Sequence, residues 1–116
     1  MKTILVVDDE ETIRNLLKEE LEDDGYWVHT ASNAKEALDL VERLPLDLVV
    51  LDIRMPGMTG LEALPRILGQ KEGLKVVIFT AYDQYKEDFM SWAADAYIVK
   101  SFDFTELKNK IKELII

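Results

Sequence analysis

Several short apolar segments of this chain end directly in a side chain that could take part in chemistry. In chain order these residues are Asp8 and Asp9 after residues 3–7, Asp52 after residues 48–51, Thr80 after residues 74–79, and Lys100 after residues 96–99. The apolar segments have the length and composition of buried strands. If the strands are parallel, their carboxyl ends meet at one edge of a sheet, where the ligands of open α/β sheets gather. The sequence therefore predicts that these side chains share one pocket.

The predicted pocket combines three carboxylates with one ammonium group and one hydroxyl group. Carboxylates held close together raise one another's pKa unless a cation neutralises them. Their oxygen atoms suit Mg²⁺, which is commonly held by one or two carboxylates and a phosphate. Lys100 and Thr80 would supply a positive charge and a hydrogen-bond donor to a bound oxyanion. These residue types predict a metal-assisted phosphoryl-transfer site with a carboxylate as the available nucleophile.

Each of these residues also has a purely structural explanation. Asp8 or Asp9 could cap the helix that follows, and Asp52 could cap a turn. Thr80 could simply end a strand, and Lys100 could be a solvated charge. The coincidence of such residues at four separate strand ends favours the shared site over these separate explanations.

The segments between the predicted strands carry apolar residues at helical spacing. We expect helices around residues 13–21, 34–41, 61–68, 83–93 and 104–114, and a further strand over residues 26–30. Phe89 should face the core, and Asp103 with Glu106 should cap the last helix. Strands that alternate with helices predict an α/β fold, a parallel sheet with helices on both faces. Right-handed crossovers make such a sheet doubly wound.

Composition limits the classes of protein to which this chain can belong. It has 116 residues, 48% hydrophobic and 32% charged, so we expect residues 1–116 to form a single globular domain. A net charge of -9 argues against direct nucleic acid binding, because the chain would repel phosphates. We expect neither a signal peptide nor a membrane anchor. The absence of cysteine excludes disulfides and thiolate metal sites and is compatible with the cytoplasm.

Four blocks of sequence contain the candidate residues. They are ILVVDDE at residues 4–10, DLVVLDIRMPGMTG at residues 47–60, VVIFTAY at residues 76–82 and ADAYIVK at residues 94–100. In this order they resemble the receiver domain of the response-regulator family, the phosphoacceptor of two-component signalling. The resemblance covers essentially the whole chain. It implies a flavodoxin-like fold, with a five-stranded parallel sheet in the order 2-1-3-4-5.

The resemblance implies which residues would hold the phosphoryl group and the metal. Asp52 would be phosphorylated, and the cofactor would be Mg²⁺. Asp9 and Asp52 would bind the metal, and Asp8 would assist directly or through water. The backbone carbonyl of Arg54 would complete the metal ligands that the protein supplies.

The resemblance also implies which residues would respond to phosphorylation. Thr80 and the backbone amide of Ala81 would contact the phosphoryl group, and Lys100 would pair with its remaining oxygen. Tyr97 matches the family's switch aromatic residue, which turns inward as Thr80 moves. These contacts would couple the chemistry at one residue to a change of conformation.

As a receiver, the chain would be a signalling domain rather than an enzyme, although it would assist its own phosphorylation and dephosphorylation. A sensor histidine kinase or a phosphotransfer protein would donate the phosphoryl group in the cytoplasm. An output domain or partner protein would read the change at the surface of residues 83–93, 96–99 and 104–114. Phosphorylation could also favour a homodimer.

Two departures from the family pattern leave alternatives open. The family usually has proline after its lysine, in a cis peptide, whereas Ser101 follows Lys100 here. Ala93 stands where glycine is common, beside an unusually bulky Trp92. A degenerate receiver that acts as an interaction module without phosphorylation therefore remains an alternative. A small Mg²⁺-dependent phosphatase is a further one, but it would want a second acid where this chain has Arg54.

Overall fold

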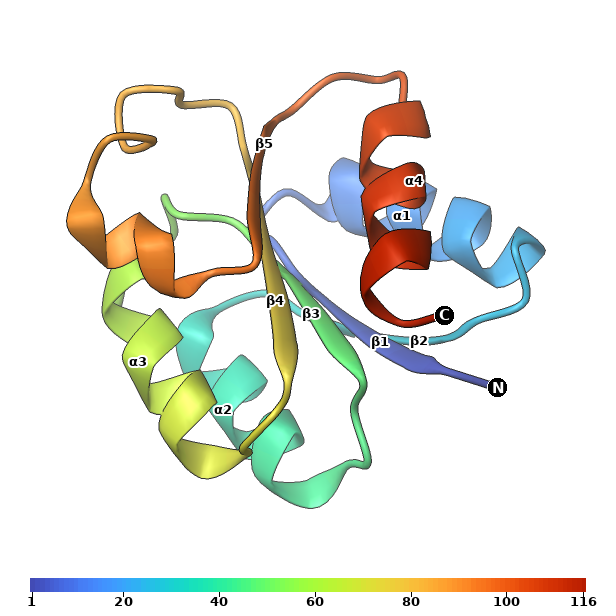
Figure 1. Ribbon diagram of the computed structural model, residues 1–116, viewed down its shortest axis with the longest axis horizontal. Coiled ribbons are helices and arrows are strands. Elements are labelled where there is room, and N and C mark those ends of the chain that lie inside the picture. The colour runs from blue at the N-terminus through green and yellow to red at the C-terminus, as the bar shows by residue number, and fades with distance from the viewer.

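Strands and helices alternate along the chain (Figure 1). The computed structural model describes the backbone of residues 1–116 and every side chain except those of residues 89 and 90. The elements are β1 Thr3–Val7, α1 Glu11–Asp23, β2 Trp27–Ala31, α2 Ala34–Arg43, β3 Leu48–Leu51, α3 Gly60–Gln70, β4 Lys75–Thr80, the short 3₁₀ helix η1 Phe89–Ala93, β5 Ala96–Val99 and α4 Thr105–Leu114. Within the described residues, no helix has the length and apolar character needed to cross a bilayer.

All the strands belong to one parallel sheet in the order β2-β1-β3-β4-β5. This confirms the predicted doubly wound, flavodoxin-like fold. Every residue of the central strand β3 is buried, because helices lie on both faces of the sheet. The unbroken apolar run that predicted this strand is thus the consequence of its double burial.

Two apolar cores lie on opposite faces of the sheet. Helices α2 and α3 cover one face, and α1 and α4 cover the other (Figure 1). Successive side chains of a strand point to opposite faces. Val49 and Leu51 therefore pack towards α2 and α3, while Leu48 and Val50 pack towards α1 and α4. Packing on both sides fixes where each strand ends.

The register of the strands brings the predicted site residues to one edge of the sheet. Val7 pairs with Leu51, and Leu51 pairs with Ile78 of β4. Thr80, the last residue of β4, pairs with Val99 of β5. The residues that follow β1, β3 and β5 therefore emerge beside Thr80, as the sequence predicted.

The predicted helix over residues 83–93 is wrong. The segment forms turns followed by η1, and its described backbone hydrogen bonds span three residues rather than four. These bonds run from Lys86 to Asp83, from Asp88 to Tyr85, from Ser91 to Asp88 and from Ala94 to Ser91. The buried Ser91 hydroxyl also donates to the Tyr85 carbonyl at 2.8 Å, and such side-chain bonds compete with a helical ladder. Phe89, which we expected in the core, lies outside the described side chains.

The region around the end of β5 also differs from expectation. Helix α4 begins at Thr105 after the N-cap residue Phe104, so the predicted cap by Asp103 and Glu106 is wrong. Asp103 Oδ1 instead accepts one hydrogen bond from the Thr105 backbone N–H, at 3.0 Å. No cis peptide bond occurs among the described residues, so the peptide bond after Lys100 is trans. The loop leading away from Lys100 is therefore not shaped by a cis bond.

Candidate functional site

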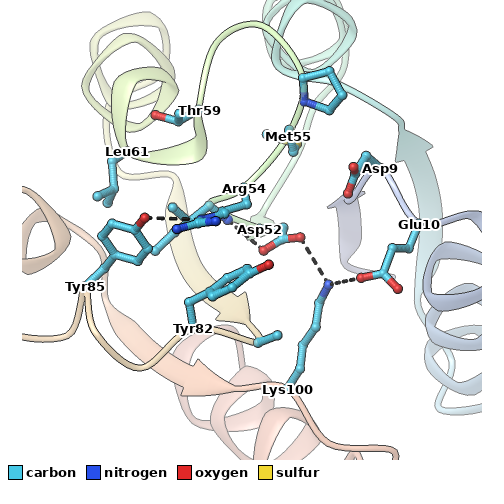
Figure 2. Close-up of a pocket in the computed structure, with 13 residues that line it drawn as sticks. Asp9, Glu10, Asp52, Arg54, Met55, Thr59, Leu61, Tyr82, Tyr85 and Lys100 are labelled. Atoms are coloured by element: carbon cyan, nitrogen blue, oxygen red, sulfur yellow. Dashed lines mark hydrogen bonds and ion pairs between the residues drawn. The ribbon is translucent and has the colours of Figure 1, made fainter.

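A cavity of about 480 Å³ opens at the carboxyl edge of the sheet (Figure 2). Its lining includes the predicted site residues Asp9, Asp52, Arg54, Ala81 and Lys100. These residues follow β1, β3, β4 and β5. The parallel sheet thus gathers into one cavity groups that are far apart in the sequence.

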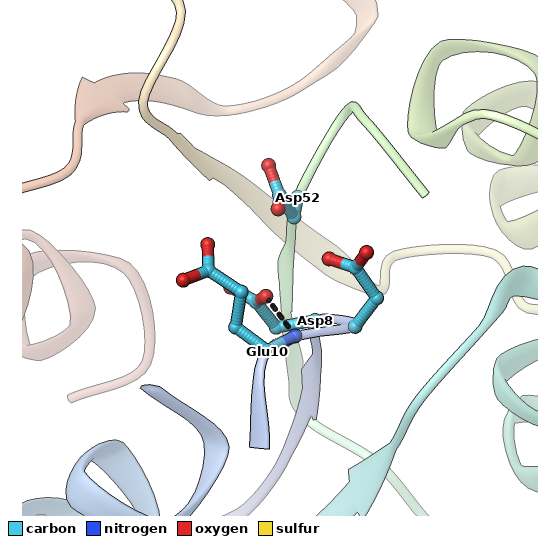
Figure 3. A group of neighbouring side chains, drawn as sticks. Asp8, Glu10 and Asp52 are labelled. Atoms are coloured by element: carbon cyan, nitrogen blue, oxygen red, sulfur yellow. Dashed lines mark hydrogen bonds between the residues drawn. The ribbon is translucent and has the colours of Figure 1, made fainter. Parts of the chain in front are cut away.

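Four carboxylates meet beside this cavity. One oxygen atom from each of Asp8, Asp9, Glu10 and Asp52 lies within 4.8 Å of the others. Figure 3 shows Asp8 and Glu10 facing Asp52 from the end of β1. Asp8 and Asp52 are buried, with exposed fractions of 2% and 4%. Burial raises the pKa of Asp8, although hydrogen bonds from Lys100 and from the Glu10 backbone oppose this shift.

The Lys100 ammonium group joins three of these carboxylates. Its Nζ lies 2.7 Å from Asp8 Oδ2, 3.1 Å from Asp52 Oδ2 and 3.1 Å from Glu10 Oε1. Burial alone would lower the pKa of Lys100, but the hydrogen bonds and charges of Asp8 and Asp52 raise it above its ordinary value. Lys100 is therefore a permanent cation, and its single charge leaves most of the carboxylate charge unbalanced.

The cluster fits a divalent cation such as Mg²⁺. Its donors are all carboxylates, the hard oxygen ligands that Mg²⁺ prefers. A Mg–oxygen distance of about 2.1 Å places opposite ligands about 4.2 Å apart. Since the oxygen atoms already lie within 4.8 Å of one another, they need only a small contraction to share one ion.

Thr80 carries an unused hydrogen-bonding group at the end of β4, directly before Ala81 of the cavity lining. Thr80 itself is not among the lining residues. Its side chain is fully buried, and Oγ1 has no hydrogen-bond partner among the described residues. Leaving a buried hydroxyl unpaired costs free energy. The Lys100 backbone N–H donates to the Thr80 carbonyl at 2.7 Å, which joins the backbones of the two predicted site residues.

The backbone around Asp52 is held tightly. The Asp52 N–H donates to the Val7 carbonyl at 3.0 Å, and the Ile53 N–H donates to Asp52 Oδ1 at 2.8 Å. Oδ2 is the oxygen that faces Lys100. Gly60, the first residue of α3, packs directly on this turn, because a Cβ atom there would lie 2.1 Å from the Asp52 carbonyl oxygen. A glycine is therefore required behind Asp52.

We expect Gly60→Ala to lower the free energy of unfolding by about 3 kcal/mol, because the backbone must move to admit the methyl group. The matched control is Gly69→Ala in the same helix, where a Cβ atom would meet nothing within 4 Å. There the better helix propensity of alanine should raise the free energy of unfolding by up to about 1 kcal/mol. Urea denaturation measures both values. Similar effects of the two substitutions would contradict the close packing of Gly60 on Asp52.

Arg54 lies between two tyrosines at the cavity (Figure 2). Its Cζ atom is 4.4 Å from the centre of the Tyr82 ring, and its Nε donates to the Tyr85 hydroxyl at 3.3 Å. A guanidinium group over an aromatic face is attracted to the ring. The hydroxyl of the half-buried Tyr97 donates to the Tyr82 carbonyl. Arg54 and Tyr82 thus stand where they can cover the approach to Asp52.

The sequence did not single out two residues of this arrangement. Glu10 directly follows Asp8 and Asp9 in the sequence, and this adjacency could have indicated that it joins the carboxylate cluster. Tyr85 reaches Arg54 because its segment is not an α-helix, which no sequence pattern indicated.

Comparison with known proteins identifies one family of similar chains. The sequence profile of the response regulator receiver domain matches residues 4–112. Sporulation initiation phosphotransferase F of Bacillus subtilis is 37% identical over 114 residues, which cover 97% of this chain and 92% of that protein. The alkaline phosphatase synthesis transcriptional regulatory protein PhoP of Bacillus subtilis is 38% identical, but this chain spans only 48% of its length. The profile match over residues 4–112 includes the carboxyl end of every strand of the sheet.

The response regulator protein TrrA of Thermotoga maritima has a closely similar solved structure, in complex with Mg²⁺-BeF. It is 54% identical, with a TM-score of 0.95 over 98% of this chain and 99% of that chain. A chain in the solved complex of the histidine kinase ThkA with TrrA also matches, at 53% identity and a TM-score of 0.93. The match covers 100% of this chain and 100% of that chain. The likeness therefore extends over the whole fold.

Proposed function

Because this chain belongs to the response regulator receiver family, we propose that residues 1–116 form a single receiver domain in which Asp52 is phosphorylated. The donor is the phosphohistidine of a sensor histidine kinase or of a phosphotransfer protein. One observation carries the proposal: the buried Asp52 carboxylate borders the cavity, 3.1 Å from Lys100 Nζ and among further carboxylates. The ammonium group, together with a cation held by the carboxylates, would stabilise the negative charge of a phosphoryl group as it is transferred to Asp52.

In the proposed transfer, an oxygen atom of Asp52 attacks phosphorus and forms an O–P bond. The N–P bond to the donor histidine breaks, and the imidazole keeps its electron pair and leaves neutral because its other nitrogen carries a proton. Asp9, Asp52 and the backbone carbonyl of Arg54 would hold Mg²⁺, with Asp8 assisting directly or through water, and the ion would neutralise charge on the transferring oxygen atoms. No proton has to be removed from Asp52, because the carboxylate itself is the nucleophile.

The remaining residues bind the phosphoryl group once it is on Asp52. Lys100 pairs with one oxygen, while the Thr80 hydroxyl and the Ala81 amide donate to another. The unpaired state of Thr80 Oγ1 supports this role. When Thr80 turns towards the phosphoryl group, Tyr97 follows and leaves its bond to the loop after β4.

The chain is a signalling domain, and its own residues set how long the signal lasts. Hydrolysis needs a water molecule in line with the O–P bond. Arg54 and Tyr82 are in contact with each other and line the cavity beside Asp52. Two large side chains in this position hinder the attacking water, so we infer slow autodephosphorylation.

Phosphotransfer from ThkA tests this function. Phosphorylated ThkA should pass its label to this chain in Mg²⁺ and not after chelation, because its known partner TrrA is 53% identical. After removal of the kinase, the label should decay slowly. The double variant Arg54→Ala with Tyr82→Ala should decay about tenfold faster, a barrier change of about 1.4 kcal/mol.

The matched control is the double variant Lys86→Ala with Glu87→Ala. It shortens two exposed side chains in the segment between β4 and η1, which also contains Tyr82. This control should decay at the wild-type rate. Transfer to the same extent with Mg²⁺ and after chelation would contradict the proposed chemistry. An unchanged or slower decay in the Arg54 and Tyr82 variant would contradict the covering role alone.

Phosphorylation then biases two conformations that are read at the surface. The expected surface consists of residues 83–93, β5 and α4, and the bonds of Lys100 to Thr80 and of Tyr97 to Tyr82 link the site to β5 and to the loop after β4. An output domain, a partner protein or a second copy of the chain would bind this surface. The expected cytoplasmic location and the lack of direct nucleic acid binding are part of the same proposal, in line with the net charge of -9.

A further inference from the structure

Glu10 contributes the most exposed of the three carboxylates that contact Lys100. Its side chain is 60% exposed, whereas those of Lys100 and Asp52 are 9% and 4% exposed. Figure 2 shows the Lys100 ammonium group between Asp52 on one side and Glu10 on the other. Since an ammonium group has three N–H donors, Asp8, Asp52 and Glu10 can use all of them.

During phosphotransfer, two of these three carboxylates would also bind other groups, and Glu10 would not. Under the proposed function, Asp52 carries the phosphoryl group and Asp8 takes part in holding the cation. A bound cation also repels the Lys100 ammonium group from the carboxylates that it occupies. Glu10 is the remaining carboxylate within 3.1 Å of Lys100 Nζ. It can hold Lys100 near the phosphoryl group after the other contacts have changed.

The backbone of Glu10 is well fixed. The Glu10 N–H donates to Asp8 Oδ1 at 2.9 Å, and its carbonyl accepts from the Arg14 N–H at 3.1 Å. The Lys100 ammonium group, in contrast, ends a flexible four-carbon side chain. A contact from a side chain with a fixed backbone can therefore position this ammonium group.

We propose that Glu10 is a positioning residue, which holds the Lys100 ammonium group at the mouth of the site so that it meets the phosphoryl group on Asp52. This role rests on the proposed function, because it acts through the phosphoryl contact of Lys100. Glu10 does not touch the reacting atoms. It keeps Lys100 over the cavity when the cation and the phosphoryl group have taken the other two carboxylates.

Beryllium fluoride binding at saturating Mg²⁺ tests this role, since beryllium fluoride on a carboxylate stands in for a phosphoryl group. Saturating Mg²⁺ removes any difference in metal affinity from the comparison. Glu10→Gln should weaken binding about fivefold, the effect expected from losing one ion pair near the surface. Fluorine NMR titration measures the affinity. The control is Glu11→Gln, which removes the same charge from an exposed neighbour that lies outside the carboxylate cluster.

Removal of a negative charge would by itself raise the affinity for an anion such as beryllium fluoride. Loss of the proposed positioning would lower that affinity, so the two effects can be told apart by their direction. The decisive comparison uses Lys100→Ala as the background. In that background Glu10→Gln should change the affinity for beryllium fluoride no more than Glu11→Gln does, because the ammonium group that Glu10 positions is absent.

Each other outcome has a defined meaning. Tighter or unchanged binding by Glu10→Gln would overturn the positioning role, and so would a loss that persists in the Lys100→Ala background. If the wild-type protein with Mg²⁺ bound does not take beryllium fluoride at all, the proposed function fails rather than this inference alone.

Discussion

Magnesium at about 100 times its dissociation constant should raise the melting temperature of the wild-type protein by about 10 °C. Asp9→Asn should lose most of this shift. The carboxylate cluster carries more negative charge than Lys100 balances, and a divalent cation relieves that repulsion in the folded state only. Thermal melts with and without Mg²⁺ measure the effect.

The same substitution should act in the opposite direction without metal. Asp9→Asn removes one charge from a crowded cluster, so the metal-free variant should melt above the metal-free wild type. Glu11→Gln is the control and should keep the full magnesium shift. An equal shift in wild type and Asp9→Asn would show that the cation binds elsewhere.

Much of the fold could be predicted from the chain because burial leaves a strong pattern. β3 is apolar at every position since both of its faces are covered. Alternation of strands and helices then fixed the α/β class. The order of the strands could not be predicted in this way, because composition and periodicity do not indicate which strands are neighbours. That order came from the resemblance to a known family, and the structure confirms it.

The segment between β4 and β5 shows where periodicity is insufficient. Tyr85, Phe89 and Trp92 have helical spacing, yet the chain forms turns and the short η1 helix. The Ser91 hydroxyl binds the Tyr85 carbonyl, and Trp92 is 69% exposed rather than packed. A side-chain bond to the backbone of this kind competes with a helical ladder, and it is not visible in the spacing of apolar residues.

The site was predictable where it depends on strand ends and less so where it depends on packing. Asp52 and Lys100 each follow a strand of the same parallel sheet, so topology alone brings them to one edge. Gly60 directly precedes the helix predicted around residues 61–68, and its lack of a side chain is what lets α3 approach Asp52. Close approach of two backbones leaves no signal in one sequence beyond the glycine itself.

Asp52→Asn should abolish phosphorylation, the largest effect expected of any single change. Asp52 is the one carboxylate of the cluster that is both buried and on the cavity lining, and its Oδ2 lies 3.1 Å from Lys100 Nζ. Asp8 is buried but is not on the lining, and Asp9 and Glu10 are exposed. An amide oxygen is a far weaker nucleophile than a carboxylate. Lys100→Ala should instead keep the labelling reaction and weaken the conformational response, because Mg²⁺ still balances much of the transferring charge.

The most direct test is intact-protein mass spectrometry after incubation with a small acyl phosphate and Mg²⁺. The wild-type protein should gain a single phosphoryl adduct that hydroxylamine removes and that peptide mapping places on Asp52. Asp52→Asn should gain none, while the control Asp83→Asn, which lies outside the carboxylate cluster, should be labelled like the wild type. A wild-type protein that stays folded with Mg²⁺ bound but takes no label from this donor or from a phosphorylated kinase would contradict the account. The chain would then be a receiver fold that serves as an interaction module.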